Sequence, residues 1–158
     1  MGATYPIALL AHSWIRWVVL ALLVVVVLRT WRGRTGFGPW SPLDERLHVA
    51  LVSVVDLQLL VGVWLYLGAS PFAQAFLADV GTNVHNRLLR FFGLEHVAMM
   101  LIAVALVHVG RARSKSAADP LQRHRRAFAW TMAALICVLA AIPWPFLPIA
   151  RPLFRFGL

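Results

Sequence analysis

Four long apolar stretches divide the chain, and polar segments rich in Arg, Gly and Pro separate them. The stretches are rich in Leu, Val and Ala without alternation of polar and apolar residues, which disfavours transmembrane β-strands. A helix needs about 20 residues to cross a hydrocarbon core, and the stretches cover approximately residues 7–28, 48–67, 88–109 and 127–146. The pattern predicts an all-α integral membrane protein, with residues 1–158 forming one transmembrane domain folded as an up-down-up-down four-helix bundle.

The amino-acid composition also indicates a membrane protein. Hydrophobic residues make up 61% of the chain and charged residues 13%, which excludes an intrinsically disordered chain. The one cysteine, Cys137, cannot form an internal disulfide or complete a cysteine-based zinc or iron–sulfur site. We therefore expect the lipid bilayer to be the main environment of the protein.

The net charge of +9 comes largely from two loops. Basic residues collect on the cytoplasmic side of membrane helices, so the loops after the first and third stretches are predicted to be cytoplasmic and both termini to face outside. This distribution explains the charge without a nucleic-acid partner. The residues are Arg29, Arg32, Arg34 and Arg46 in one loop and Arg111, Arg113, Lys115, Arg123, Arg125 and Arg126 in the other.

Local signals mark several boundaries and contacts. Ser41 followed by Pro42 is typical of a helix start and predicts a short interfacial helix before the second stretch. Residues 71–80 are expected to form a short interfacial helical turn. Gly62 and Gly68 are predicted to allow close packing between helices.

Ionisable residues inside a membrane are expensive and point to function. Counted from the outer ends of their helices, His12 and His96 lie at a similar depth. Two histidines facing each other at one level of a bundle can hold a haem through both axial positions. The alternative is that each imidazole hydrogen-bonds a neighbouring helix.

Arg16 follows His12 by one helical turn and so lies on the same face. It could bind a haem propionate through two parallel hydrogen bonds, or it could form an intramembrane ion pair with Asp56, and the sequence leaves both interpretations open. Glu95 adjoins His96 but points about 100° away around the helix, so it is not expected to orient that imidazole.

A second haem between His48 and His108 is disfavoured. His96 and His108 are some 120° out of register on their helix, whereas two stacked haems need ligands on one stripe. His85 and His124 are expected to be solvated loop residues.

The chain resembles a family of small four-helix bacterial membrane proteins described as b-type cytochromes. The resemblance implies a haem b with His12 and His96 as candidate iron ligands, in a bacterial inner membrane. It rests on His12-Ser13-Trp14-Ile15-Arg16-Trp17, Asp56-Leu57-Gln58-Leu59-Leu60-Val61-Gly62, Arg90-Phe91-Phe92-Gly93-Leu94-Glu95-His96, Val109-Gly110-Arg111 and Ile142-Pro143-Trp144-Pro145-Phe146.

Three functions fit this pattern. The first is a non-catalytic cytochrome that passes single electrons, with a quinol, a periplasmic carrier or a larger membrane complex as partner. The second is a cofactor-free structural or assembly subunit of a membrane complex. The third is a small proton or solute conductor that uses the charged residues inside the membrane.

Overall fold

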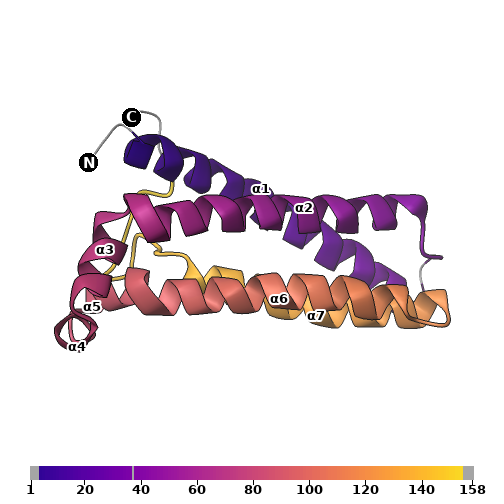
Figure 1. The fold of residues 1–158 in the computed structure, drawn as a ribbon. Helices are drawn as coiled ribbons and strands as arrows, with labels where there is room; N and C mark the ends of the chain where they lie inside the picture. Colours follow the sequence, from indigo (N-terminus) through magenta and orange to yellow (C-terminus); the bar gives the residue numbers. More distant parts are fainter. Residues whose placement is uncertain (1–3, 37, 155–158) are drawn as a thin grey trace.

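The computed structural model describes residues 4–36 and 38–154, and within these residues it contains helices and turns but no strand (Figure 1). The all-α prediction is therefore confirmed for the described part of the chain. The helices are α1 (Thr4–Arg34), α2 (Pro42–Trp64), α3 (Pro71–Ala78), α4 (Val80–Asn83), α5 (Arg87–Arg90), α6 (His96–Lys115) and α7 (Pro120–Ala141), with π-helical turns η1 (Leu65–Ala69) and η2 (Phe91–Glu95).

Three helical segments among the described residues are long and apolar enough to cross a membrane: Thr4–Arg34, Pro42–Ala69 and Arg87–Lys115. The first is α1, the second joins α2 to η1, and the third joins α5, η2 and α6. α7 does not join this group, although it has 22 residues. Its first two turns carry Arg123, Arg125 and Arg126, which interrupt the apolar pattern.

The four long helices pack side by side, with α1 crossing the other three at an angle (Figure 1). α1 packs against α2 and α7, and α6 packs against the same two helices. α1 and α6 therefore lie diagonally opposite each other, as do α2 and α7. A contact between a residue of α1 and a residue of α6 therefore crosses the middle of the bundle.

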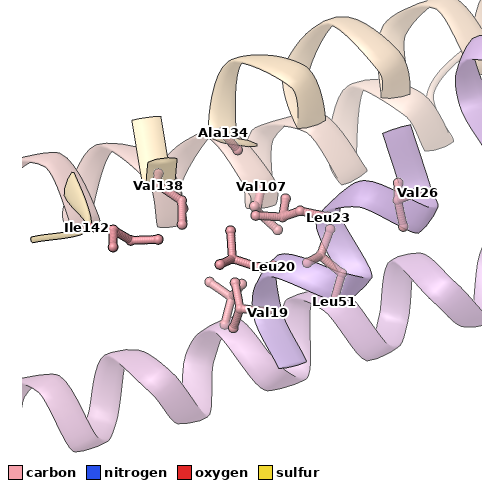
Figure 2. Close-up of a cluster of buried hydrophobic side chains, with 11 residues drawn as sticks. Val19, Leu20, Leu23, Val26, Leu51, Val107, Ala134, Val138 and Ile142 are labelled. Carbon is pink, nitrogen blue, oxygen red and sulfur yellow. The ribbon is translucent and has the colours of Figure 1, made fainter. Parts of the chain in front are cut away.

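The shared core lies between these helices near their middle. In Figure 2, Leu20 and Leu23 of α1 lie close to Val107 of α6, with Leu51 of α2 and Val138 of α7 completing the cluster. α7 contributes small or β-branched residues to its buried face, a pattern that lets backbones approach closely when lipid weakens the hydrophobic drive. These residues are Ala127, Thr131, Ala134, Val138 and Ala141.

The turns between α1 and α2 and between α6 and α7 lie at the same end of the helices, which we name the basic end (right in Figure 1). Glu45 joins the two turns, because Arg111 and Arg123 both form ion pairs with its carboxylate. Arg29 and Asp44 form a further ion pair there, with 2.7 Å between Nε and Oδ1. The two Arg-rich loops of the sequence thus meet in space.

A helix does start after Ser41, with a reciprocal cap, but it is α2 itself and not a separate short interfacial helix, so the long helix begins at Pro42 and not at the predicted residue 48. The Ser41 hydroxyl accepts the backbone N–H of Asp44 at 3.3 Å, and the Asp44 carboxylate accepts the Ser41 N–H at 2.8 Å. The short helix predicted for residues 71–80 is also present, as α3, which ends two residues earlier at Ala78.

The predicted boundaries of the fourth long helix, 127–146, are wrong at both ends. α7 begins at Pro120, because the Asp119 carboxylate caps the helix by accepting the Gln122 N–H at 2.8 Å. It ends at Ala141, two residues before Pro143. This shift moves His124 from a loop into the second turn of a helix.

Candidate functional site

His12 of α1 and His96, the first residue of α6, face each other at the end opposite the basic end. Their ring centroids are 6.3 Å apart with an angle of 67° between the ring planes. A direct hydrogen bond between two imidazoles would bring the centres to about 5 Å. The two rings therefore lie edge to face without a direct hydrogen bond, and the contact joins diagonally opposite helices.

A carbonyl group at the end of α7 orients the His96 ring. His96 Nδ1 lies 3.0 Å from the carbonyl oxygen of Ala141. A carbonyl only accepts, so Nδ1 carries the proton in this contact and Nε2 keeps its lone pair. This is the arrangement in which a histidine binds a metal through Nε2, with the carbonyl fixing its tautomer.

The proline pattern after α7 explains why that carbonyl is available. In a continued helix the N–H groups of residues 143 and 145 would donate to Leu139 and Ala141, but both positions are proline and have no N–H. The indole N–H of Trp144 donates to the Leu139 carbonyl at 2.8 Å. His96 takes the Ala141 carbonyl, so this proline-rich segment helps to build the site.

The His12 ring lacks such an anchor. Its Nδ1 is buried and has no hydrogen-bond partner among the described residues. A Cβ added at Gly62 of α2 would lie 3.4 Å from Cε1 of His12, so Gly62 faces the edge of the ring at about an ordinary contact distance. Gln58 holds the backbone instead, its amide donating to the His12 carbonyl at 3.0 Å. Gly62 thus lies against α1, although a Cβ there would make only an ordinary contact. The close-packing role predicted for Gly68 is wrong, because a Cβ there would meet nothing within 4 Å.

The segment that follows α7 folds back onto α1 beside the two histidines. The Leu153 carbonyl accepts a hydrogen bond from Arg16 Nη2 at 2.6 Å and another from Trp17 Nε1 at 3.1 Å. On the other side, the rings of Phe91 and Phe92 lie 5.8 and 6.4 Å from that of His96. Aromatic side chains and one guanidinium thus border the pair.

The structure gives Asp56 a partner other than Arg16, the residue considered for it from the sequence. Its carboxylate lies 2.8 Å from Nε2 of His108, in a contact between α2 and α6 whose two side chains are each 46% exposed. Glu95 pairs with Arg90, with 2.6 Å between Oε1 and Nε, so it turns away from His96 as the helical geometry predicted.

His48 and His108, the pair considered and disfavoured for a second haem, have different neighbours. The His48 ring is buried and lies 5.2 Å from that of Trp40, whereas His108 is exposed beside Asp56. The sequence interpretation of His124 as a solvated loop residue is wrong: its side chain is 2% exposed and its ring lies 5.0 Å from that of Trp40.

A sequence signal for the burial of His124 exists. Asp119 followed by Pro120 is a helix start, and from there His124 falls on the same stripe as Ala127 and Thr131. The prediction for His85 agrees with the structure, since that residue is exposed.

The geometry of the His12 and His96 pair fits a metal ion that takes two protein ligands. Two metal–imidazole bonds of about 2 Å placed in line separate the ring centres by roughly 6 Å, close to the observed 6.3 Å. Among the described residues no three His, Cys, Asp or Glu side chains gather as a metal site. A metal bound here would take its other ligands from a cofactor, as iron does in haem.

Comparisons with protein-family models, with curated proteins and with solved structures find no match. The chemistry of this site is therefore inferred from the geometry of its own residues.

Proposed function

We propose that the protein is a membrane b-type cytochrome that passes single electrons, with one haem b bound between His12 and His96. The observation that carries the proposal is the spacing of the two imidazoles. They come from helices that are distant in sequence and diagonal in space, and their centres are 6.3 Å apart. The unpartnered Nδ1 of His12 supports it.

The residues around the pair have separate tasks in this proposal. A bound haem supplies a one-electron redox centre. The Ala141 carbonyl fixes the tautomer of His96 and makes its Nε2 more basic. Arg16 lies beside the pair and binds a propionate in this account, while Phe91 and Phe92 keep water away. Two histidine ligands leave no open position on the iron, so electron transfer is favoured over catalysis.

We further propose that α7 crosses the membrane with the other three long helices, which gives a four-helix transmembrane bundle. From Ala127 onward α7 contains no charged residue, and Ile136 on its surface is 60% exposed. Large apolar residues are exposed on α2 and η1 as well, with Leu60 of α2 at 68% and Leu67 of η1 at 66%. Such surfaces suit lipid contact.

The charge distribution sets the proposed orientation. The basic end faces the cytoplasm by the positive-inside rule, so both ends of the chain face the outside of a bacterial inner membrane. Cysteine accessibility in a Cys137→Ser background tests this orientation. His85→Cys should react with an impermeant thiol reagent on intact cells and Ser116→Cys should not; the reverse pattern would contradict it.

The experiment that tests the function is a reduced-minus-oxidised absorption spectrum of the protein purified in detergent, with haem quantified per chain. The proposal predicts a low-spin haem b spectrum and one haem per chain. A colourless protein would contradict it and favour a cofactor-free subunit. The electron partner in this proposal is a quinol, a periplasmic carrier or a larger membrane complex.

A further inference from the structure

Buried nitrogens without hydrogen-bond partners gather at the basic end, away from the histidine pair described above. Buried polar groups in proteins are nearly always hydrogen-bonded, so such a cluster needs an explanation. Within residues 4–36 and 38–154, seven of these atoms belong to this end: Arg34 Nε, Trp40 Nε1, His48 Nε2, Arg111 Nη1, Arg123 Nε, and Nδ1 and Nε2 of His124.

The Trp40 ring connects the members of this cluster. Its centroid lies 5.2 Å from that of His48, 5.0 Å from that of His124 and 4.2 Å from the guanidinium carbon of Arg123. Arg123 shares the carboxylate of Glu45 with Arg111. The connected side chains come from α2, α6, α7 and the turn before α2.

Arg34 belongs to the same region through its neighbour Gly33. A Cβ added at Gly33 would lie 2.3 Å from Cγ of His124, so the α1 backbone rests directly on that ring. The Arg34 guanidinium lies over the ring of Phe128, 4.0 Å from its centroid. The end of α1 thus contributes a fourth helix to the cluster.

The chemistry of the unpartnered atoms defines the missing group. Arginine and indole nitrogens donate hydrogen bonds and do not accept them. The two histidines are 3% and 2% exposed, so water does not surround them. The nearby carboxylates are already engaged, Asp44 by Arg29 and Ser41 and Glu45 by two arginines. A group that satisfies the cluster must accept several hydrogen bonds and carry negative charge.

We propose that this cluster, His48, His124, Trp40, Arg34, Arg111 and Arg123, binds a phosphate group at the basic end of the helices. Phosphate is tetrahedral and accepts hydrogen bonds on several sides, which suits donors that come from four helices. Basic pockets between helices on the cytoplasmic side of a membrane bind anionic lipid headgroups. The phosphate comes either from such a lipid or from a soluble phosphate compound.

A second haem is the competing occupant, because two histidines are present. The Trp40 ring contacts both imidazoles, which therefore do not face each other directly as His12 and His96 do. The phosphate site does not depend on whether haem binds at the opposite end.

The test is a titration of the purified full-length chain in neutral detergent with phosphatidylglycerol in mixed micelles and, separately, with inorganic phosphate, followed by calorimetry. Arg123→Lys keeps the charge but removes Nε–H and the planar fork, and Trp40→Phe keeps a ring but removes the indole N–H. Each should weaken binding by about tenfold. The matched control is Arg125→Lys, an exposed neighbour of the same type, which should bind like the wild type.

The two probes identify the source of the phosphate. Binding of the lipid without competition from inorganic phosphate supports a headgroup site, and competition by inorganic phosphate supports a soluble ligand. Equal affinity in the wild type, Arg123→Lys and Trp40→Phe, or no binding of either probe, would overturn the proposal. Loss of haem on His124→Phe substitution would also overturn it, because the occupant would then be a second haem.

Discussion

The two histidine clusters use the same residue types in different surroundings. At one end, the rings of His12 and His96 face each other with their centroids 6.3 Å apart, and two phenylalanine rings lie beside His96. At the other end, Trp40 contacts both His48 and His124, and arginines surround them.

The difference shows that a pair of buried histidines does not by itself define a metal site. The space between the rings and the charge around them decide what can bind. Two imidazoles that face each other directly, one of them anchored by a carbonyl, suit a metal ion. Two imidazoles that both contact one tryptophan ring, with several unpartnered donors nearby, suit an anion.

The largest effect on stability is expected from Gly33→Ala, which tests how tightly α1 packs against the His124 ring. The new Cβ would lie 2.3 Å from the His124 ring, so the free energy of unfolding should fall by about 1–3 kcal/mol. Gly62→Ala is the matched control, because its Cβ would lie 3.4 Å from the His12 ring and a small ring shift relieves the contact. Unfolding in detergent measures both, and equal losses would contradict the difference.

A smaller effect is expected from Asp44→Ala. The Asp44 side chain is 3% exposed and holds both Arg29 and the start of α2, so its removal should cost about 1–2 kcal/mol of unfolding free energy. Glu95→Ala breaks an ion pair whose side chains are 38% and 42% exposed, which should cost about 0–1 kcal/mol. The same unfolding experiment compares them. A larger loss of unfolding free energy for Glu95→Ala would mean that the Arg90–Glu95 ion pair stabilises the fold more than the Arg29–Asp44 ion pair at the basic end.

The smallest effect is expected on redox properties rather than on folding. Arg16→Leu should lower the midpoint potential of the haem, because a nearby cation favours the reduced state. Asp56→Asn should leave the potential unchanged, since the Asp56 carboxylate contacts His108. A redox titration measures both, with Arg32→Leu, an exposed arginine of α1, as control. If Asp56→Asn reproduces the Arg16→Leu shift, Arg16 acts through an ion pair with Asp56.

Much of the fold could be predicted because the length and apolar character of a helix are local properties. Ser41 and Pro42 marked the start of α2, and a residue count placed His12 and His96 at one level, where the structure has them facing each other. The start of α7 was missed because the prediction followed apolar residues, and the first two turns of α7 are basic. The Asp119 cap starts the helix at Pro120 despite these basic residues, and this early start places His124 on the buried face of α7.

Other features depend on contacts between distant segments and have no local pattern. The Tyr66 hydroxyl of η1 donates to the Gly93 carbonyl of η2 at 2.9 Å, so the two π-helical turns support each other. The anchoring of His96 similarly requires the end of α7 to meet the start of α6. The cluster around Trp40 requires segments from four helices, which no single stretch of sequence reveals.

The most direct test of the haem site is the spin state of the ferric iron, measured by electron paramagnetic resonance in the wild type and in four single variants. The account predicts a low-spin signal in the wild type, and loss of haem or a high-spin signal in His12→Ala and in His96→Ala. His48→Ala and His124→Ala should keep the low-spin signal. A full low-spin signal that survives the loss of either His12 or His96 would contradict the account.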